Sequence, residues 1–251
     1  AALWLKSVSR GSPEASSGAA LALAMSGPAV ATAFCLGAAS GVAIALARGA
    51  GQPRAQGRIQ RLRAEDAMFL LCDVQEKFRG LIHKMPHVIA TSRAMLGCAS
   101  TLDIPVIVTE QYPKFFQSTV AELDVSQAKV FAKTAFSMCT SEVMECLRAT
   151  GRRSVVLFGI EAHVCVQQTV LDLTALGYEV HIVGDGVSSQ RALDRSIALQ
   201  RVQAAGAVVT TAESLLFELL RSKDHPAFKS VSKIAKDFAE AVAALGEERL
   251  V

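Results

Sequence analysis

Short apolar runs alternate with longer amphipathic segments from about residue 66 onward. The runs have the length of buried β-strands, which predicts strands at residues 68–72, 106–109, 130–132, 155–158, 179–183 and 207–210. The segments between them predict helices at residues 88–102, 141–148, 163–176, 192–205, 212–221 and 227–245. Strands that are apolar throughout and separated by helices indicate a parallel sheet with helices on both faces. The predicted fold class is therefore a three-layer α/β/α domain.

The longest uncharged stretch lies near the N-terminus, from residue 15 to residue 47, and Pro28 divides it. Residues 29–47 would span about 28 Å as a helix, close to the hydrocarbon thickness of a bilayer. Gly37 and Gly41 form a GxxxG pattern, which lets another helix approach closely in lipid. We predict a membrane helix at about residues 29–47; an uncleaved targeting segment and a linker that does not insert are the alternatives.

These patterns divide the 251 residues into three parts. Residues 1–65 form an N-terminal extension that contains the membrane helix and a basic, glycine-rich linker. Residues 66–225 form the globular domain, and residues 226–251 form a C-terminal helical extension.

Charge is unevenly distributed between the extension and the domain. Residues 1–64 carry seven Lys or Arg and one acidic residue, whereas residues 65–251 carry nineteen Lys or Arg and twenty-two Asp or Glu. The mildly acidic domain argues against a nucleic-acid-binding protein. The arginines that follow residue 47 mark the flank that is not translocated, so the domain is expected on the cytoplasm-equivalent side of the membrane.

The six cysteines are irregularly spaced, and no two of them form a CxxC pair. Most lie inside apolar runs, which indicates small buried side chains in a reducing compartment rather than a disulfide framework. No histidine pairs with a cysteine at the spacing of zinc ligands, so neither a metal nor a cofactor is predicted.

Three residues with catalytic chemistry follow three of the predicted strands. Asp73 comes directly after the first strand, Lys133 after the third, and Cys165 at the start of the helix that follows the fourth. Reactive groups of open parallel sheets gather at the carboxyl ends of the strands, so these side chains are expected within a few ångströms of each other. A helix start stabilises a thiolate, a carboxylate can take its proton, and a lysine can keep that carboxylate ionised. Each residue alone is more commonly structural; the order of the three is what favours a site.

The segments around these residues resemble the isochorismatase-like hydrolase family. The resemblance lies in DVQEKF (residues 73–78), AKTAFSM (residues 132–138) and GIEAHVCV (residues 159–166). TEQYP (residues 109–113) and DGVSS (residues 185–189) further resemble the eukaryotic isochorismatase domain-containing proteins. The resemblance covers about residues 66–225 and implies the fold of that family.

The resemblance implies a catalytic triad of Asp73, Lys133 and Cys165. In related amidases the thiolate attacks a carbonyl carbon and releases an amine, and water then cleaves the acyl-enzyme. The resemblance also implies a cis peptide bond between Ile160 and Glu161. This bond would aim the backbone N–H groups of Glu161 and Cys165 at the developing oxyanion.

The chain also departs from some relatives within this superfamily. Metal-dependent nicotinamidases carry histidines after the second strand, and residues 109–117 contain none, which argues against a catalytic metal and against nicotinamidase activity. True isochorismatases lack the nucleophilic cysteine. The presence of Cys165 therefore favours hydrolysis of a C–N bond in a small amide or carbamoyl compound over cleavage of isochorismate.

Five further residues are candidates to line the substrate pocket: Gln75, Phe78, Tyr112, Phe136 and His163. Aromatic residues at such positions are as commonly part of the core, and His163 has the alternative of capping its helix or facing solvent. Asp185, at the expected end of the fifth strand, is interpreted as a structural hydrogen-bond acceptor.

Two functions are consistent with these patterns. The first is a membrane-tethered cysteine hydrolase that acts on a small molecule. The second is an accessory subunit of a large mitochondrial membrane complex, which contacts other subunits through Gly37 and Gly41 and retains the hydrolase fold as a scaffold. A homo-oligomer is a further option. The basic, alanine-rich N-terminal segment favours the mitochondrial inner membrane with the domain on the matrix side; a plastid membrane and the soluble matrix are the alternatives.

Overall fold

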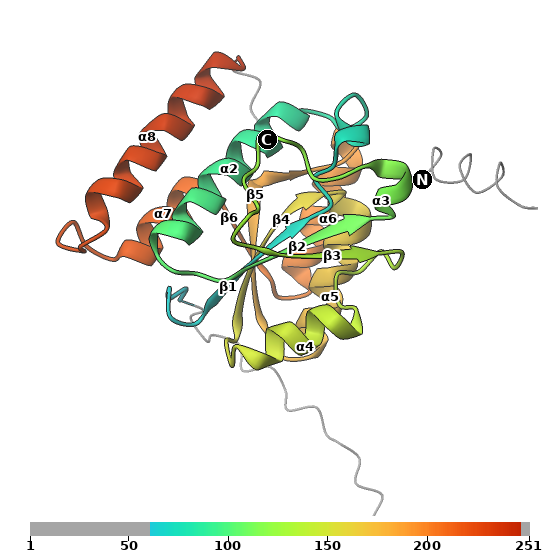
Figure 1. Ribbon diagram of the computed structural model, residues 1–251, viewed down its shortest axis with the longest axis horizontal. Helices are drawn as coiled ribbons and strands as arrows, with labels where there is room; N and C mark the ends of the chain where they lie inside the picture. Colours follow the sequence, from blue (N-terminus) through green and yellow to red (C-terminus); the bar gives the residue numbers. More distant parts are fainter. Residues whose placement is uncertain (1–60, 247–251) are drawn as a thin grey trace, which may run out of the picture. The chain divides into compact units, whose positions relative to one another are not determined.

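The computed structural model describes residues 61–246, which belong to one compact unit. Six parallel strands form one sheet in the order β3-β2-β1-β4-β5-β6 (Figure 1). They are β1 (Ala67–Cys72), β2 (Val106–Gln111), β3 (Lys129–Lys133), β4 (Ser154–Ile160), β5 (Glu179–Ser188) and β6 (Val208–Thr210). The predicted six-stranded parallel sheet is confirmed, and all six carboxyl ends lie at the same edge.

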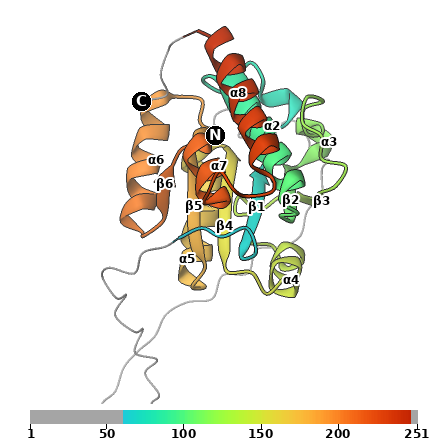
Figure 2. The same ribbon diagram turned by 90° about the vertical axis from the view of Figure 1, so that its left-hand side faces the viewer.

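Helices cover both faces of this sheet (Figure 2). One face packs against α2 (Met85–Thr101) and α7 (Ala212–Leu220), and α8 (Phe228–Ala244) packs on these two helices. The other face packs against α4 (Ser141–Ala149), α5 (Gln167–Ala175) and α6 (Ala192–Ala204). The short helix α3 (Pro113–Phe116) and the single turns η1 (Glu76–Phe78) and η2 (Ala162–Val166) lie in the connections.

The central strand β1 shows why an uninterrupted apolar run specifies this architecture. All six of its residues are buried. Phe69 and Leu71 face the core under α2 and α7, whereas Met68 and Leu70 face the core under α4 and α5. The ring of Phe69 packs edge-to-face on that of Phe158 in β4, with 6.1 Å between the centroids. A strand enclosed on both faces has no place for a polar side chain.

Strand β5 is longer than the sequence pattern predicts. It continues past residue 183 to Ser188, and its pairing with β4 shifts where Leu157 opposes Ile182 but Gly159 opposes Val187. The Arg195 guanidinium donates hydrogen bonds to the carbonyl oxygens of Gly184 and Val187 across this irregular stretch. The expectation that Asp185 ends the strand is therefore wrong, because side-chain donors stabilise an extended segment whose sequence is typical of a turn.

The helix expected at residues 163–176 has two parts. The first is the π-helical turn η2, in which the Val166 N–H donates to the Glu161 carbonyl oxygen at 3.2 Å. The second is the regular helix α5. The wider first turn sets the position of Cys165, which lies inside it.

Helix α8 corresponds to the predicted C-terminal helical extension. It lies along the outer side of α2 (Figure 2), with Val231 and Ala235 buried against the core. Gly97 of α2 lies beneath Ile234 of α8, where a methyl group would be in ordinary van der Waals contact at 3.5 Å from Ile234 Cδ1. This packing makes α8 part of the same compact unit as the sheet.

Within residues 61–246, no helix combines the length and the apolar character that crossing a bilayer requires. The predicted membrane helix at residues 29–47, with Gly37 and Gly41, lies outside the residues that the structure describes.

Candidate active site

The structure brings Asp73, Lys133 and Cys165 together at the carboxyl edge of the sheet. Asp73 directly follows β1, Lys133 is the last residue of β3, and Cys165 lies in η2 after β4. The Lys133 Nζ donates to Asp73 Oδ2 at 2.6 Å, and one carboxylate oxygen of Asp73 lies within 4.8 Å of Cys165 Sγ. All three residues are buried. A carboxylate thus stands between an ammonium group and a thiol.

The Asp73 carboxylate is held from two sides. Its backbone is left-handed (φ 53°), and its N–H donates to the Thr109 carbonyl oxygen at 3.1 Å. Its Oδ1 accepts a hydrogen bond from Thr109 Oγ1 at 2.7 Å, while Oδ2 accepts from Lys133. Burial raises the pKa of Asp73, and the Lys133 charge and these hydrogen bonds only partly oppose that rise. The carboxyl group therefore exchanges its proton closer to neutral pH than an ordinary aspartate.

The Lys133 ammonium faces four protein acceptors. Besides Asp73 it donates to Gln111 Oε1 at 2.7 Å, to the Phe136 carbonyl oxygen at 3.0 Å and to the Ala135 carbonyl oxygen at 3.2 Å. Burial lowers the pKa of Lys133, but the negative charges that Cys72, Asp73 and Cys165 can carry outweigh this effect and raise it overall. Lys133 thus stays protonated. With its three protons directed at these acceptors, it acts on Asp73 rather than as a free donor.

Gln75 and Gln111 connect the ends of β1 and β2 beneath this pair. The Gln75 side chain donates to the carbonyl oxygens of Gln117 (2.6 Å) and Gln111 (3.1 Å) and accepts from the Gln111 N–H at 2.8 Å. Gln111 in turn donates to the Thr134 carbonyl oxygen at 2.9 Å. Gln75, predicted as a pocket residue, is fully buried, and its amide binds the backbone.

Two residues of this network, Thr109 and Gln111, were not assigned a role from the sequence. A signal for them exists, because both are polar residues at the carboxyl end of β2, the strand that separates β1 from β3. Polar side chains at that end of a buried strand lie at the edge where the other site residues meet.

Cys165 is 7% exposed and is tied to the segment that follows β3. Its carbonyl oxygen accepts from Thr169 Oγ1 at 2.7 Å, and the same hydroxyl oxygen accepts from the Met138 N–H at 2.9 Å. This pair of hydrogen bonds fixes η2 relative to the loop that follows Lys133 and carries Phe136.

The peptide bond between Ile160 and Glu161 is cis, at the position where the resemblance places it. Gly159, one residue earlier, has a φ of +116°, and a methyl side chain there would lie 2.2 Å from the Cys72 carbonyl oxygen. Only glycine fits this contact between β4 and β1. The Glu161 carboxylate accepts hydrogen bonds from the backbone N–H (3.1 Å) and the side-chain amide (3.2 Å) of Gln190.

The other predicted pocket residues have different surroundings. Phe78 stacks on Phe116 with 4.7 Å between the ring centroids, and Tyr112 is 46% exposed and donates its N–H to the Lys133 carbonyl oxygen at 2.8 Å. Phe136 packs partly buried against the core beside α4 and α5.

His163, the remaining predicted pocket residue, joins η2 to the start of α6. Its Nδ1 lies 3.0 Å from Ser189 Oγ, and its Nε2 lies 3.8 Å from Asp194 Oδ2.

A second thiol lies beside the candidate nucleophile. The sulfur atoms of Cys72 and Cys165 and one carboxylate oxygen of Asp73 all lie within 4.8 Å of one another. Burial raises the pKa of Cys72 well above its usual value, an effect that the adjacent Cys165 and Asp73 reinforce. No pattern in the sequence indicates this contact, because Cys72 has the position of the last apolar residue of a strand.

These three residues also form the one group with metal-ligand spacing among residues 61–246. Two sulfurs and a carboxylate suit a soft divalent ion such as zinc. The same carboxylate binds the Lys133 ammonium at 2.6 Å, so a cation would have to compete with that charge. The arrangement fits acid–base and nucleophilic chemistry better than metal binding.

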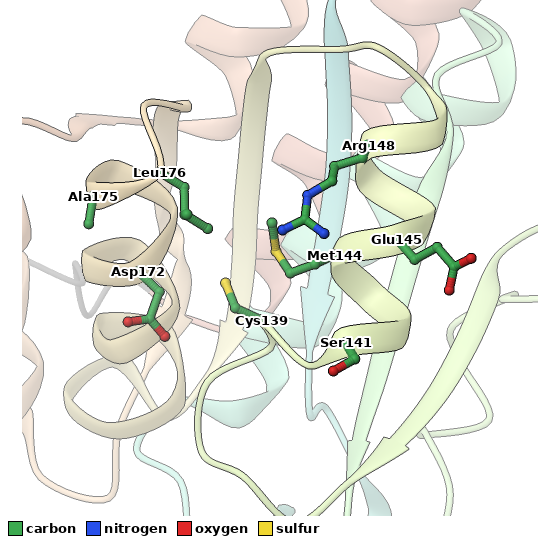
Figure 3. Close-up of a pocket in the computed structure, with 8 residues that line it drawn as sticks. All are labelled: Cys139, Ser141, Met144, Glu145, Arg148, Asp172, Ala175 and Leu176. Atoms are coloured by element: carbon green, nitrogen blue, oxygen red, sulfur yellow. The ribbon is translucent and has the colours of Figure 1, made fainter.

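A hollow of about 640 Å³ lies elsewhere, between α4 and the C-terminal part of α5 (Figure 3). It is lined by Cys139, Ser141, Met144, Glu145, Arg148, Asp172, Ala175 and Leu176. Burial raises the pKa of the Cys139 thiol to about 11, so this cysteine is a weak nucleophile at neutral pH. None of the triad residues lines the hollow, which is therefore not the candidate active site.

Comparisons with known proteins agree with the fold. The isochorismatase domain family matches residues 67–214. Isochorismatase domain-containing protein 1 of Danio rerio is 48% identical over 172 residues, which cover 68% of this chain and 61% of that protein. The secreted isochorismatase effector Isc1 of Phytophthora sojae is 44% identical over 187 residues, which cover 72% of this chain and 89% of the effector.

Among solved structures, the MAR1 ribonuclease from Caenorhabditis elegans is 43% identical and superimposes with a TM-score of 0.67. The match covers 70% of this chain and 92% of that one. The class that the sheet and the site define is that of the isochorismatase-like hydrolases. The chain belongs to the isochorismatase domain family, and its match spans about three fifths of the length of the Danio rerio protein.

Proposed function

We propose that the chain is a cysteine hydrolase that cleaves a C–N bond in a small amide or carbamoyl compound. The observation that carries this proposal is the buried Asp73 carboxylate, which contacts the Lys133 ammonium at 2.6 Å and lies within 4.8 Å of the Cys165 sulfur. In this assignment Cys165 is the nucleophile, Asp73 the general base and Lys133 the cation that keeps Asp73 anionic.

The first half of the proposed reaction forms a thioester. Asp73 removes the proton from the Cys165 thiol, and the thiolate attacks the carbonyl carbon of the substrate. The negative charge then moves to the carbonyl oxygen, where backbone N–H groups around Glu161 and Cys165 stabilise it. Asp73 returns its proton to the nitrogen, the C–N bond breaks, and the amine leaves.

The second half releases the acid. Asp73 takes a proton from a water molecule, and the resulting hydroxide attacks the thioester. The carboxylic acid departs and the sulfur of Cys165 recovers the proton, so one water is consumed for each C–N bond cleaved. The raised pKa of Asp73 suits a group that must accept and return a proton in every cycle.

The pocket assignments are part of the same proposal. Tyr112 and Phe136 lie next to Lys133 in the fold, since the Tyr112 N–H and the Phe136 carbonyl oxygen both bond to that residue. His163 lies two residues before Cys165 and next to Ser189. We propose that these side chains border the substrate, with Phe78 and Gln75 supporting the loops behind them.

Mass spectrometry of the intact protein tests the proposal. A panel of small primary amides, carbamoyl compounds and the corresponding p-nitrophenyl esters is incubated with the full chain and quenched in acid. We expect an acyl adduct on Cys165 with at least one compound, and no adduct in Cys165→Ala. Cys139→Ala, which removes a half-buried thiol in the α4–α5 hollow, is the matched control and should acylate normally.

Two outcomes of this experiment would count against the proposal. An adduct on another cysteine would reassign the nucleophile, and turnover that persists in Cys165→Ala would exclude covalent catalysis by this residue. Isochorismate and a single-stranded RNA belong in the panel, because relatives carry the names isochorismatase effector and ribonuclease. Turnover of either one alone would replace the C–N assignment.

We further propose a membrane tether through residues 29–47, supported by their uncharged sequence and by the arginines that follow. The proposed location is the mitochondrial inner membrane with the domain on the matrix side. Carbonate extraction of a membrane fraction should leave the full chain in the pellet. Its release into the supernatant would favour a peripheral or soluble protein.

The second candidate function is a subunit of a larger membrane assembly. The GxxxG pattern of Gly37 and Gly41 supports it, because small residues allow close helix contacts in lipid. Native electrophoresis after mild detergent extraction should then show the chain in a large complex. Migration of wild type and Gly37→Ile alike as a small species would contradict this role.

A homo-oligomer is proposed on different grounds. Leu193 and Ile197 lie one turn apart on α6 and are 68% and 54% exposed, which leaves apolar surface for a second copy. Light scattering of residues 61–246 should give a mass above that of one chain, and Leu193→Lys should reduce it.

A further inference from the structure

Two thiols face each other where the proposed reaction needs only one. Cys72 is the last residue of β1, Cys165 lies in η2, and their sulfur atoms are within 4.8 Å of each other. A disulfide bond has a sulfur–sulfur distance of about 2.05 Å, so the two sulfurs must approach by less than about 3 Å. Rotation of the two side chains is a movement on that scale.

The two thiols differ in access. Cys72 is fully buried, whereas Cys165 is 7% exposed. Burial raises the pKa of Cys72 well above its usual value. A small oxidant that enters the site therefore meets Cys165 first and finds a second thiol directly behind it.

We propose that Cys72 is a resolving cysteine, which converts peroxide-oxidised Cys165 into a reversible intramolecular disulfide. In the first step the Cys165 thiol reacts with a hydroperoxide (ROOH) to give a sulfenic acid, and ROH leaves. In the second step Asp73, whose carboxylate oxygen lies within 4.8 Å of Cys72 Sγ, takes the Cys72 proton and the Cys72 sulfur attacks the sulfenic sulfur. The S–S bond forms, and the sulfenic oxygen takes the proton from Asp73 and leaves as water. Two equivalents of a thiol, or one dithiol, reduce the disulfide and restore both cysteines.

This pairing gives the site a defined response to oxidation. A sulfenic acid with no thiol nearby proceeds to sulfinic acid, which thiols do not reduce. The other cysteines of the described chain lie elsewhere: Cys98 in α2, Cys139 just before α4 and Cys146 within α4. The inference shares with the proposed function only the premise that Cys165 is a reactive thiol.

The experiment uses the full chain and measures the oxidation state of its cysteines rather than its activity. The reduced protein is treated with hydrogen peroxide, its free thiols are blocked with N-ethylmaleimide under denaturing conditions, and the product is mapped by peptide mass spectrometry. We expect loss of two of the six thiols, a crosslinked peptide that joins Cys72 to Cys165, and full recovery with dithiothreitol.

Two variants sharpen the result. In Cys72→Ala, Cys165 should be trapped as a sulfenic acid by dimedone and then advance to sulfinic acid, so that dithiothreitol no longer restores it. Cys98→Ala removes an equally buried cysteine of α2, whose pKa burial raises to about 12, and should behave as wild type. If Cys72→Ala does not fold, the crosslink map of wild type decides the question alone.

The outcomes separate this inference from the proposed function. Oxidation of Cys165 to sulfinic acid without a crosslink, a crosslink to a different cysteine, or no oxidation of Cys165 would each overturn the inference. If the Cys72–Cys165 disulfide forms but none of the amides acylates Cys165, the redox pair is supported and the hydrolase is rejected. Acylation of Cys165 without the disulfide would support the hydrolase while rejecting the redox pair.

Discussion

Asp73 and Asp185 are carboxyl groups near the carboxyl edge of the sheet, Asp73 buried and Asp185 half-buried, and burial raises the pKa of each. Asp73 contacts an ammonium group at 2.6 Å and lies within 4.8 Å of two thiols. Asp185 accepts the first N–H of α7, from Ala212, at 2.9 Å. The nearby Arg195 partly opposes the rise of its pKa and binds the carbonyl oxygens of the β5 irregularity.

The difference between them shows that burial of a carboxyl group does not by itself indicate a reactive site. Asp185 holds a helix start next to an irregular strand, and no nucleophile belongs to its set of contacts. Asp73 is buried beside a fixed cation and an adjacent thiol, and this combination is what supports proton transfer.

The largest expected effect is on turnover, which should depend on Asp73 and not on Asp185. Cys165→Ala and Asp73→Asn should each reduce turnover of an active amide substrate by about 10⁴-fold, because nucleophile and base act as one unit. Asp185→Asn should leave the turnover of the folded protein within about threefold of wild type, since an asparagine oxygen can still accept the Ala212 N–H. The measurement is kcat corrected for the folded fraction. Equal losses at both aspartates would remove the distinction.

The cation beside each aspartate, Lys133 for Asp73 and Arg195 for Asp185, should also differ in its effect on stability and on the pH profile of activity. Lys133→Met leaves Asp73 buried without its partner and should lower the free energy of unfolding by about 3–5 kcal/mol. Activity requires ionised Asp73, so it rises with pH through the pKa of that group. Loss of the Lys133 charge raises this pKa further, so the acid limb of kcat/KM should move to higher pH. Arg195→Met should destabilise the fold by about 1–3 kcal/mol without moving that limb. An unchanged pH profile in Lys133→Met would contradict the electrostatic role of this lysine.

Gly159 tests how closely β4 must approach β1 at Cys72, the residue before Asp73. Gly159→Ala places a methyl group 2.2 Å from the Cys72 carbonyl oxygen at a φ of +116°, so we expect a loss of about 3 kcal/mol or more. Gly80→Ala, where the added methyl meets nothing within 4 Å, should change stability by less than about 0.5 kcal/mol. Urea denaturation of both variants provides the comparison.

The smallest effect concerns the pH dependence of stability at Asp185. The pKa of Asp185 is raised in the folded state, so above about pH 4 this carboxyl group binds more protons in the folded protein than in the unfolded chain. The stabilisation is complete below the unfolded pKa and is lost as pH rises through the folded pKa. Asp185→Asn should remove this decline and alter the free energy of unfolding at pH 7 by about 1 kcal/mol at most. If the free energy of unfolding of Asp185→Asn depends on pH between pH 4 and pH 7 in the same way as that of wild type, Asp185 does not titrate in this way.

The sheet could be predicted from the sequence because buried parallel strands are continuous apolar runs, and Asp73, Lys133 and Cys165 follow from where three such runs end. The extension of β5 could not be predicted, because Gly184 and Gly186 flank Asp185 in a segment typical of a turn. Contacts from distant parts of the chain, among them Arg195 and Thr91, stabilise it as a strand. The residues that contact the triad were harder still to predict from the sequence. Cys72 contacts Cys165 of η2 and Gln111 contacts Lys133 of β3, and no local pattern reveals either contact.

The complete enclosure of β1 has a consequence for how the site can move. Its amide groups pair with β2 on one side and β4 on the other, and all six side chains are buried. Amide hydrogens in such a strand exchange with solvent only when the whole domain opens. Asp73 and Cys72 are thus joined to the slowest-exchanging part of the chain. For the proposed substrate to enter, we expect the opening to come from the segments around Tyr112 and Phe136 rather than from β1.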